Sequence, residues 1–265
     1  MSALVRGAAG RLRHGEYGLT PAQSALEIVD VLARGEGIRH RVTIPEGYTV
    51  RQIADGFGAA GLVDRERFIE LALRRARSLG HPVLANLPVD SLEGYLFPDT
   101  YALPRGLGEA AVLKHLLDRF EAMIGPGVYS AARARRLTLH QLLTMASMIE
   151  REARVPDERS IIASVIYNRL ERKMRLEIDA TVLYALGVHK EQLTFADLAT
   201  VSPYNTYRVE GLPPGPIANP GLASIIAAAA PMRSRYLYYV LRPDGSHQFS
   251  RTLEEHEDAV RRYRP

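Results

Sequence analysis

Residues 138–170 have the sequence TLHQLLTMASMIEREARVPDERSIIASVIYNRL, which is the densest helical pattern in the chain. Thr138 and Gln141 have the spacing of a capping box. In this motif two side chains at the start of a helix accept hydrogen bonds from backbone amides that have no partner within the helix. Apolar residues then recur with the helical period as far as Ile149. Because proline cannot continue a helix, Pro156 predicts an end or a kink there, followed by a second buried helix.

Two glutamates, Glu150 and Glu152, lie at the end of the first helix. At 100° per residue they fall about 200° apart, on opposite edges of the apolar stripe. Arg154 follows Glu150 by four residues, which favours an ion pair on the helix surface. The two glutamates are therefore expected to have different surroundings.

Glu152 has no basic residue three or four positions later, and the helical wheel places it between Met145, Met148 and Ile149. Partial burial and the negative end of the helix dipole both disfavour its ionised form, so we expect a raised pKa. A carboxylic acid that keeps its proton near neutrality can protonate a glycosidic oxygen. The alternative is a solvated glutamate at a frayed helix end.

Upstream of this region the pattern is mixed. Residues 20–37 predict a helix capped by Thr20 or Ser24, and residues 39–58 predict a strand, a turn and a helix. Residues 80–90 contain prolines and a glycine without periodicity, which predicts a boundary between regions 1–88 and 89–265. A further helix is predicted over residues 108–124.

Downstream, residues 202–221 contain five of the chain's 16 prolines. Tyrosines and apolar residues are spaced through this segment, which favours an ordered loop around a cleft over disorder. The segments YLYYV and SHQFS flank the turn RPDG and predict a β-hairpin over residues 236–250. A capping box at Thr252 and Glu255 opens a final helix.

Composition excludes several classes of protein. The chain has 265 residues and no cysteine, which excludes disulfides, thiolate zinc sites, iron–sulfur clusters and a cysteine nucleophile. Its eight histidines lack metal-binding spacing and no glycine-rich phosphate loop is present, so we expect no metal and no cofactor. The net charge of +4 comes from scattered residues, which argues against a nucleic-acid partner. The first thirteen residues contain no apolar run long enough for a signal peptide or a membrane helix.

Six segments together resemble the MltG (YceG-like) family of endolytic murein transglycosylases. In order along residues 14–264 they are EGYTVRQIADGF, EGYLFPDTY, TMASMIEREA, ERSIIASVIYNRLERKMRLEIDATVLYALG, SPYNTYRVEGLPPGPIANPG and YLYYVLRPDGSHQFS. The block from residue 143 to 221 is the most specific, whereas EGYTVRQIADGF alone only resembles LysM glycan-binding repeats. The resemblance implies an α+β fold in which a small LysM-like module precedes a mostly helical, lytic-transglycosylase-like catalytic domain with a C-terminal β-hairpin.

The resemblance also implies an activity and a site. The activity is cleavage between N-acetylmuramic acid and N-acetylglucosamine within glycan strands, which leaves 1,6-anhydromuramyl ends and terminates strand elongation. The family's catalytic residue is the second glutamate of its Glu-x-Glu motif, which falls on Glu152. We expect substrate-binding residues in the proline-rich loop and behind it, with a structural role as the alternative for each: Tyr204, Asn205, Tyr207, Glu93, Tyr95, Asp179 and Thr181.

The implied partners are peptidoglycan strands and the cell-wall synthesis machinery, at the periplasmic face of the inner membrane. Family members are usually held there by an N-terminal helix, and we expect that helix to lie outside this sequence. A noncatalytic peptidoglycan-binding protein is the rival hypothesis. Glu152 distinguishes the two, because a protein that only binds glycan does not need a carboxyl group in an apolar setting.

Overall fold

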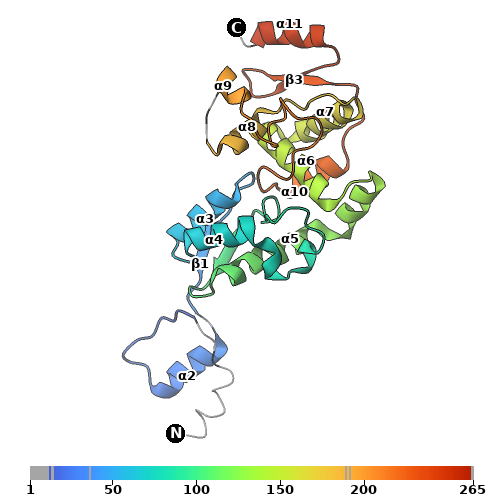
Figure 1. Cartoon of the computed structure of the whole chain (residues 1–265). Coiled ribbons are helices and arrows are strands. Elements are labelled where there is room, and N and C mark those ends of the chain that lie inside the picture. Colours follow the sequence, from blue (N-terminus) through green and yellow to red (C-terminus); the bar gives the residue numbers. More distant parts are fainter. Residues whose placement is uncertain (1–11, 13–14, 36, 189, 191, 264–265) are drawn as a thin grey trace.

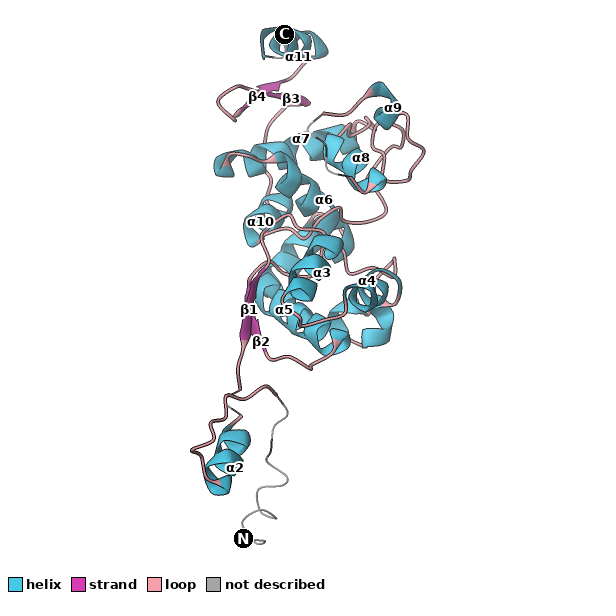
Figure 2. Ribbon diagram, turned by 90° about the vertical axis from the view of Figure 1, so that its left-hand side faces the viewer, coloured by secondary structure: helices cyan, strands magenta, loops and turns pink. Residues whose placement is uncertain are grey.

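The computed structural model describes residues 12, 15–35, 37–188, 190 and 192–263. Helices dominate these residues, and two small antiparallel sheets accompany them, as the α+β class predicts (Figures 1 and 2). The helices are α2 (Ala25–Arg34), α3 (Val50–Ala59), α4 (Arg65–Arg74), α5 (Glu109–Ala134), α6 (Leu139–Glu152), α7 (Arg159–Glu171), α8 (Asp179–Leu186), α9 (Phe195–Leu198), α10 (Leu222–Ala229) and α11 (Leu253–Tyr263). The strands are β1 (His40–Thr43), β2 (Thr100–Leu103), β3 (Tyr238–Leu241) and β4 (His247–Ser250).

Helix α6 is the centre of the fold. Its predicted capping box is present, because the Thr138 side chain accepts from the amide of Gln141 and the Gln141 side chain accepts from that of Thr138. Every residue from Leu142 to Ile149 is buried, against α10, α7, α8 and α5. The helix ends at Glu152, and Pro156 opens a short 3-10 turn before α7, so the predicted interruption is confirmed.

Strands β1 and β2 frame a unit with the order strand, helix, helix, strand. They pair antiparallel, with His40 opposite Leu103. Helices α3 and α4, which lie between the two strands in the sequence, pack against each other. Because β2 lies after residue 88, this pairing crosses the boundary expected between 1–88 and 89–265. That division and the LysM-like character of the unit stay predictions.

Helix α5 is longer than the predicted span of residues 108–124. It continues to Ala134 through a kink at Gly125, whose φ of 59° lies in the left-handed region. Pro126 follows directly, where it lacks an amide hydrogen to donate to the preceding turn. The prediction found the first part of α5 and missed its continuation beyond the kink.

The predicted hairpin over residues 236–250 is confirmed as β3 and β4, with Tyr239 opposite Phe249 and Leu241 opposite His247. Because strand side chains alternate, these four residues share one face. Helix α11 packs against the hairpin, and Figure 2 shows the pair at the end of the molecule opposite α2. Among the described residues no helix is long and apolar enough to span a membrane.

Candidate active site around Glu152

Glu152 is the last residue of α6 and is half-buried. The apolar residues that the helical wheel places beside it, Met145, Met148 and Ile149, are fully buried. The hydroxyl of Tyr239 on β3 donates to Oε2 of Glu152 over 3.0 Å. The catalytic candidate is therefore a half-buried carboxyl group at the end of a buried helix, with one oxygen held by a hydrogen bond.

Tyr207 lies close to this carboxyl group, and Asp179 is the hydrogen-bond partner of Tyr207. The hydroxyl of Tyr207 donates to Oδ1 of Asp179, the first residue of α8, over 2.5 Å. Burial raises the pKa of Tyr207, and the negative charges of Asp179 and Glu152 raise it further. Burial and Glu152 also raise the pKa of Tyr239 well above its usual range. Both phenols therefore remain protonated donors at neutral pH.

Asn205 is buried in the loop that carries Tyr207, and Thr181 is buried on α8. The side-chain amide of Asn205 donates to the carbonyl oxygens of Leu198 and Thr200, and its oxygen accepts from the amide of Tyr207. The hydroxyl of Thr181 donates to the carbonyl of Ile178 and lies 2.9 Å from the hydroxyl of Thr206. The contact between Thr181 and Thr206 fastens the proline-rich loop to α8, and the bonds of Asn205 fasten the loop to Leu198 and Thr200 at the end of α9. These contacts support the structural alternative for both residues.

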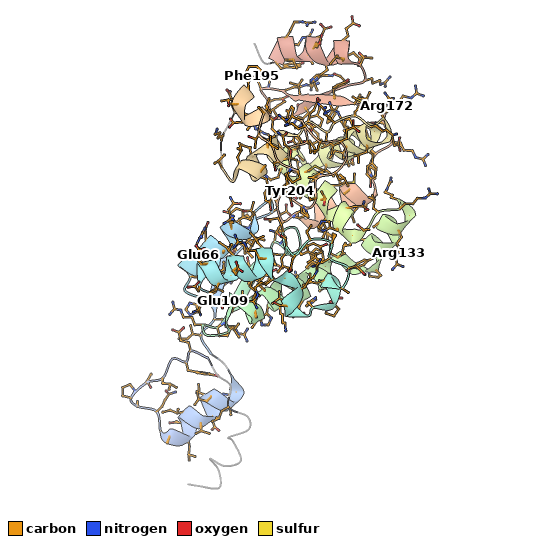
Figure 3. All side chains as sticks on the ribbon, in the orientation of Figure 1. Glu66, Glu109, Arg133, Arg172, Phe195 and Tyr204 are labelled. Carbon is orange, nitrogen blue, oxygen red and sulfur yellow. The ribbon has the colours of Figure 1, made fainter. Side chains whose placement is uncertain are left out.

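Tyr204 belongs to the same loop, but it lies where the α3 and α8 regions meet (Figure 3). Its ring packs on that of Tyr184 at a centroid distance of 5.0 Å. The hydroxyl of Tyr184 in turn donates to Glu93 over 3.3 Å. Tyr204 therefore belongs to the same side-chain cluster as Glu93.

Glu93 is 3% exposed and accepts hydrogen bonds from the amide of Val50 and the side chain of Asn219, each over 3.0 Å. Burial raises its pKa to about 8, against the lowering effects of these bonds and of Arg51. Its partners come from α3 and from the proline-rich loop. Glu93 is thus a buried junction between two regions of the chain.

Tyr95 is a core residue. Its ring packs on Phe120, and its hydroxyl lies 3.1 Å from Nδ1 of His140, whose Nε2 is 2.8 Å from the carbonyl oxygen of Pro214. Tyr95 and His140 line a groove of about 1050 Å³ that is bounded by neither Glu152 nor Tyr207. Among the seven expected binding residues, the structure brings Tyr207 to Glu152 and Asp179 to Tyr207, and places Glu93, Tyr95 and Tyr204 elsewhere.

The prediction of an ion pair between Glu150 and Arg154 on the helix surface is wrong. The Glu150 side chain is only 8% exposed, and its Oε2 accepts from the amide of Gly221 over 3.0 Å. Arg159 approaches its other oxygen at 3.8 Å, whereas Arg154 is exposed. The reason is tertiary: the end of the proline-rich loop covers this edge of α6, which no local pattern predicts.

Sequence analysis missed Tyr239 and the residues that support it. Glu158 accepts from the backbone amide of His247 over 2.8 Å, and its other oxygen lies 2.6 Å from Nδ1 of the same residue. The ring of His247 meets that of Tyr239 edge-on at 5.3 Å. The predicted hairpin contains both Tyr239 and His247, but nothing in the sequence pattern identified α6 as its neighbour.

The described portion of the chain holds no group of three or more His, Cys, Asp or Glu residues arranged for a metal ion. What the site contains is one carboxyl group, two phenols and a second carboxylate that is bonded to one of those phenols. Such a set can exchange a proton with a bound oxygen and bind hydroxyl groups.

Comparisons with known proteins agree with one another. A family model described as the YceG-like family matches residues 1–262. An endolytic murein transglycosylase of Bacillus subtilis (strain 168) is 36% identical over 270 residues, which cover 97% of this chain and 74% of the relative. One of Streptococcus pneumoniae serotype 2 is 32% identical over 94% of this chain, which spans 50% of that relative.

A crystal structure of a putative YceG-like protein from Listeria monocytogenes superposes with a TM-score of 0.75. Its sequence is 36% identical, and the match covers 97% of this chain and 88% of that one. Since the family model and these relatives extend over nearly the whole chain, the protein belongs to the YceG-like family.

Proposed function

We propose that the chain is an endolytic murein transglycosylase and that Glu152 is its general acid and base. The observation that carries the proposal is the setting of Glu152, a half-buried carboxyl group at the end of the buried helix α6 with Tyr239 bonded to one oxygen. The names of the Bacillus and Streptococcus relatives support the substrate and the reaction class. Peptidoglycan strands are therefore the proposed substrate.

In the proposed reaction, Glu152 gives its proton to the glycosidic oxygen as the bond between that oxygen and C1 of N-acetylmuramic acid breaks. The 6-hydroxyl of the same sugar bonds to C1, and its proton returns to Glu152. No water is consumed, and the product carries a 1,6-anhydro ring. Because the nucleophile is already attached to the reacting sugar, its effective concentration is high and a second catalytic carboxylate is not needed.

The remaining parts of the site have proposed supporting roles. Tyr207, fixed by Asp179, offers a phenol close to Glu152 for binding sugar hydroxyls. The β1–α3–α4–β2 unit is proposed to bind glycan away from the reacting bond, as a LysM-like module. We place the reaction at the outer face of the inner membrane, where it would end the growth of nascent strands.

Mass spectrometry of the products released from purified sacculi tests this function. We expect muropeptides with 1,6-anhydromuramyl ends and no requirement for added metal. Reducing muramic ends would show that water is the nucleophile and would contradict the transglycosylase mechanism. Binding to sacculi without any released product would favour the noncatalytic binding protein.

A further inference from the structure

Within the proposed function, we infer that Tyr239 is a positioning residue that keeps the transferable proton of Glu152 on Oε1. The bond from the Tyr239 hydroxyl to Oε2 carries this inference. In a protonated carboxyl group, the oxygen that accepts a hydrogen bond is preferentially the carbonyl oxygen. Because Oε2 accepts the bond from Tyr239, the proton of Glu152 preferentially resides on Oε1. The acid then presents its proton in one orientation.

The bond from Tyr239 persists through both protonation states of Glu152. Burial and the adjacent carboxylate raise the pKa of Tyr239 well above its usual range, so the phenol stays a donor. The same bond stabilises the carboxylate after the proton has left. Tyr239 therefore fixes the direction of transfer and also favours the return of the carboxyl group to its starting geometry.

One ring contact within the hairpin and one backbone bond from α7 hold Tyr239 in place. Its edge-on contact with His247 has an interplanar angle of 83°, and Glu158 fixes His247 through its backbone amide and its ring nitrogen. Nε of Arg169, on α7, donates to the carbonyl of Leu237 over 2.6 Å, which anchors the start of β3. The ring that carries the hydroxyl is thus bound to the region around α7 before substrate arrives.

Tyr239→Phe is the informative variant, because it removes the hydroxyl and leaves the ring. Tyr238→Phe is the matched control: Tyr238 is next in the chain, faces the other side of β3 and stacks on His256. In Tyr239→Phe we expect kcat to fall about tenfold with KM unchanged, since a misplaced proton slows transfer without weakening binding. We also expect the titration midpoint of the Glu152 carboxyl group to rise by about one pH unit.

Two measurements test the inference: turnover of glycan strands against pH, and carbon-13 NMR titration of the Glu152 carboxyl group. The NMR titration needs no turnover, so it separates this inference from the proposed reaction. A higher midpoint and a lower kcat in Tyr239→Phe, with parental values in Tyr238→Phe, would support it. An unchanged midpoint, unchanged kcat, or the same changes in Tyr238→Phe would overturn it, as would a loss of activity explained by a lower melting temperature alone.

Discussion

At the scale of single residues, Glu150 and Glu152 differ because the chain covers the two edges of α6 differently. Glu150 binds the amide of Gly221, at the start of α10, and its charge adds to desolvation in raising the pKa of Glu46. Glu152 instead receives the hydroxyl of Tyr239. Helical periodicity predicted that the two glutamates lie on opposite edges. It could not predict their partners, which lie 71 and 87 residues away.

Glu93 gives a prediction at the same scale. The pKa of Glu93 is about 8 in the folded chain, against an ordinary value of about 4.3. Between these two pH values the folded protein keeps a proton on Glu93 that the unfolded chain releases. The stability from this group is therefore complete at low pH and is lost as pH rises toward 8. The slope reaches about 1.4 kcal/mol per pH unit.

Glu93→Gln removes this titration and keeps groups that can bond the amide of Val50 and the oxygen of Tyr184. Urea unfolding between pH 5 and 8.5 is the measurement. We expect the variant to lose less stability than the parent over this interval. Parallel stability curves for the two proteins would contradict the assignment.

At the scale of elements, the proline-rich loop 202–221 covers Glu150 on α6, and the hairpin reaches Glu152 at the end of the same helix. Tyrosines and apolar residues spaced through the loop predicted that it is ordered, and two segments flanking the turn RPDG predicted the hairpin. The sequence did not reveal which elements they cover, because those contacts depend on packing between distant segments. The loop crosses the EGYLFPDTY segment so closely that Pro216 lies against Gly94.

The contact between Gly94 and Pro216 predicts how much stability the fold loses when a methyl group is added at Gly94. A Cβ at Gly94 would lie 2.4 Å from Cγ of Pro216, and the φ of +86° disfavours any side chain. Gly94→Ala should therefore destabilise the fold by about 3 kcal/mol or more. Gly245→Ala is the control, since its φ is +85° with nothing within 4 Å, and it should cost about 1–2 kcal/mol. Equal losses in denaturant unfolding would show that the close packing of the loop is unimportant.

At the scale of the whole molecule, a single hydrophobic core runs from the β1–β2 unit through α5 and α6 to α10. The expected boundary after residue 88 followed from local composition, which reports where the chain lacks periodicity. Composition carries no information on strand pairing, and β1 pairs with β2 across that boundary. Helix α2 differs, because none of its residues is buried and it lies apart from the rest in Figure 1.

Two truncations test this organisation. Removing residues 1–37 takes away α2 and should change the free energy of unfolding by about 1 kcal/mol or less, as for other surface changes. Removing residues 1–88 leaves β2 unpaired and deprives Glu93 of Val50, so cooperative unfolding should be lost. Calorimetry of both fragments is the measurement. A cooperative transition in residues 89–265 would show that this region folds independently.

The central claim, that Glu152 transfers the proton, is tested most directly by release of anhydromuropeptides from Glu152→Gln and Glu150→Gln at equal folded concentration. Glutamine preserves the packing at Glu152 but carries no transferable proton, so turnover should fall by roughly 2 to 4 orders of magnitude. Glu150→Gln keeps an oxygen for the amide of Gly221 and should lower stability by about 1–2 kcal/mol while turnover stays near the parent level. Near-parental turnover in Glu152→Gln, or loss of turnover in Glu150→Gln alone, would contradict the account.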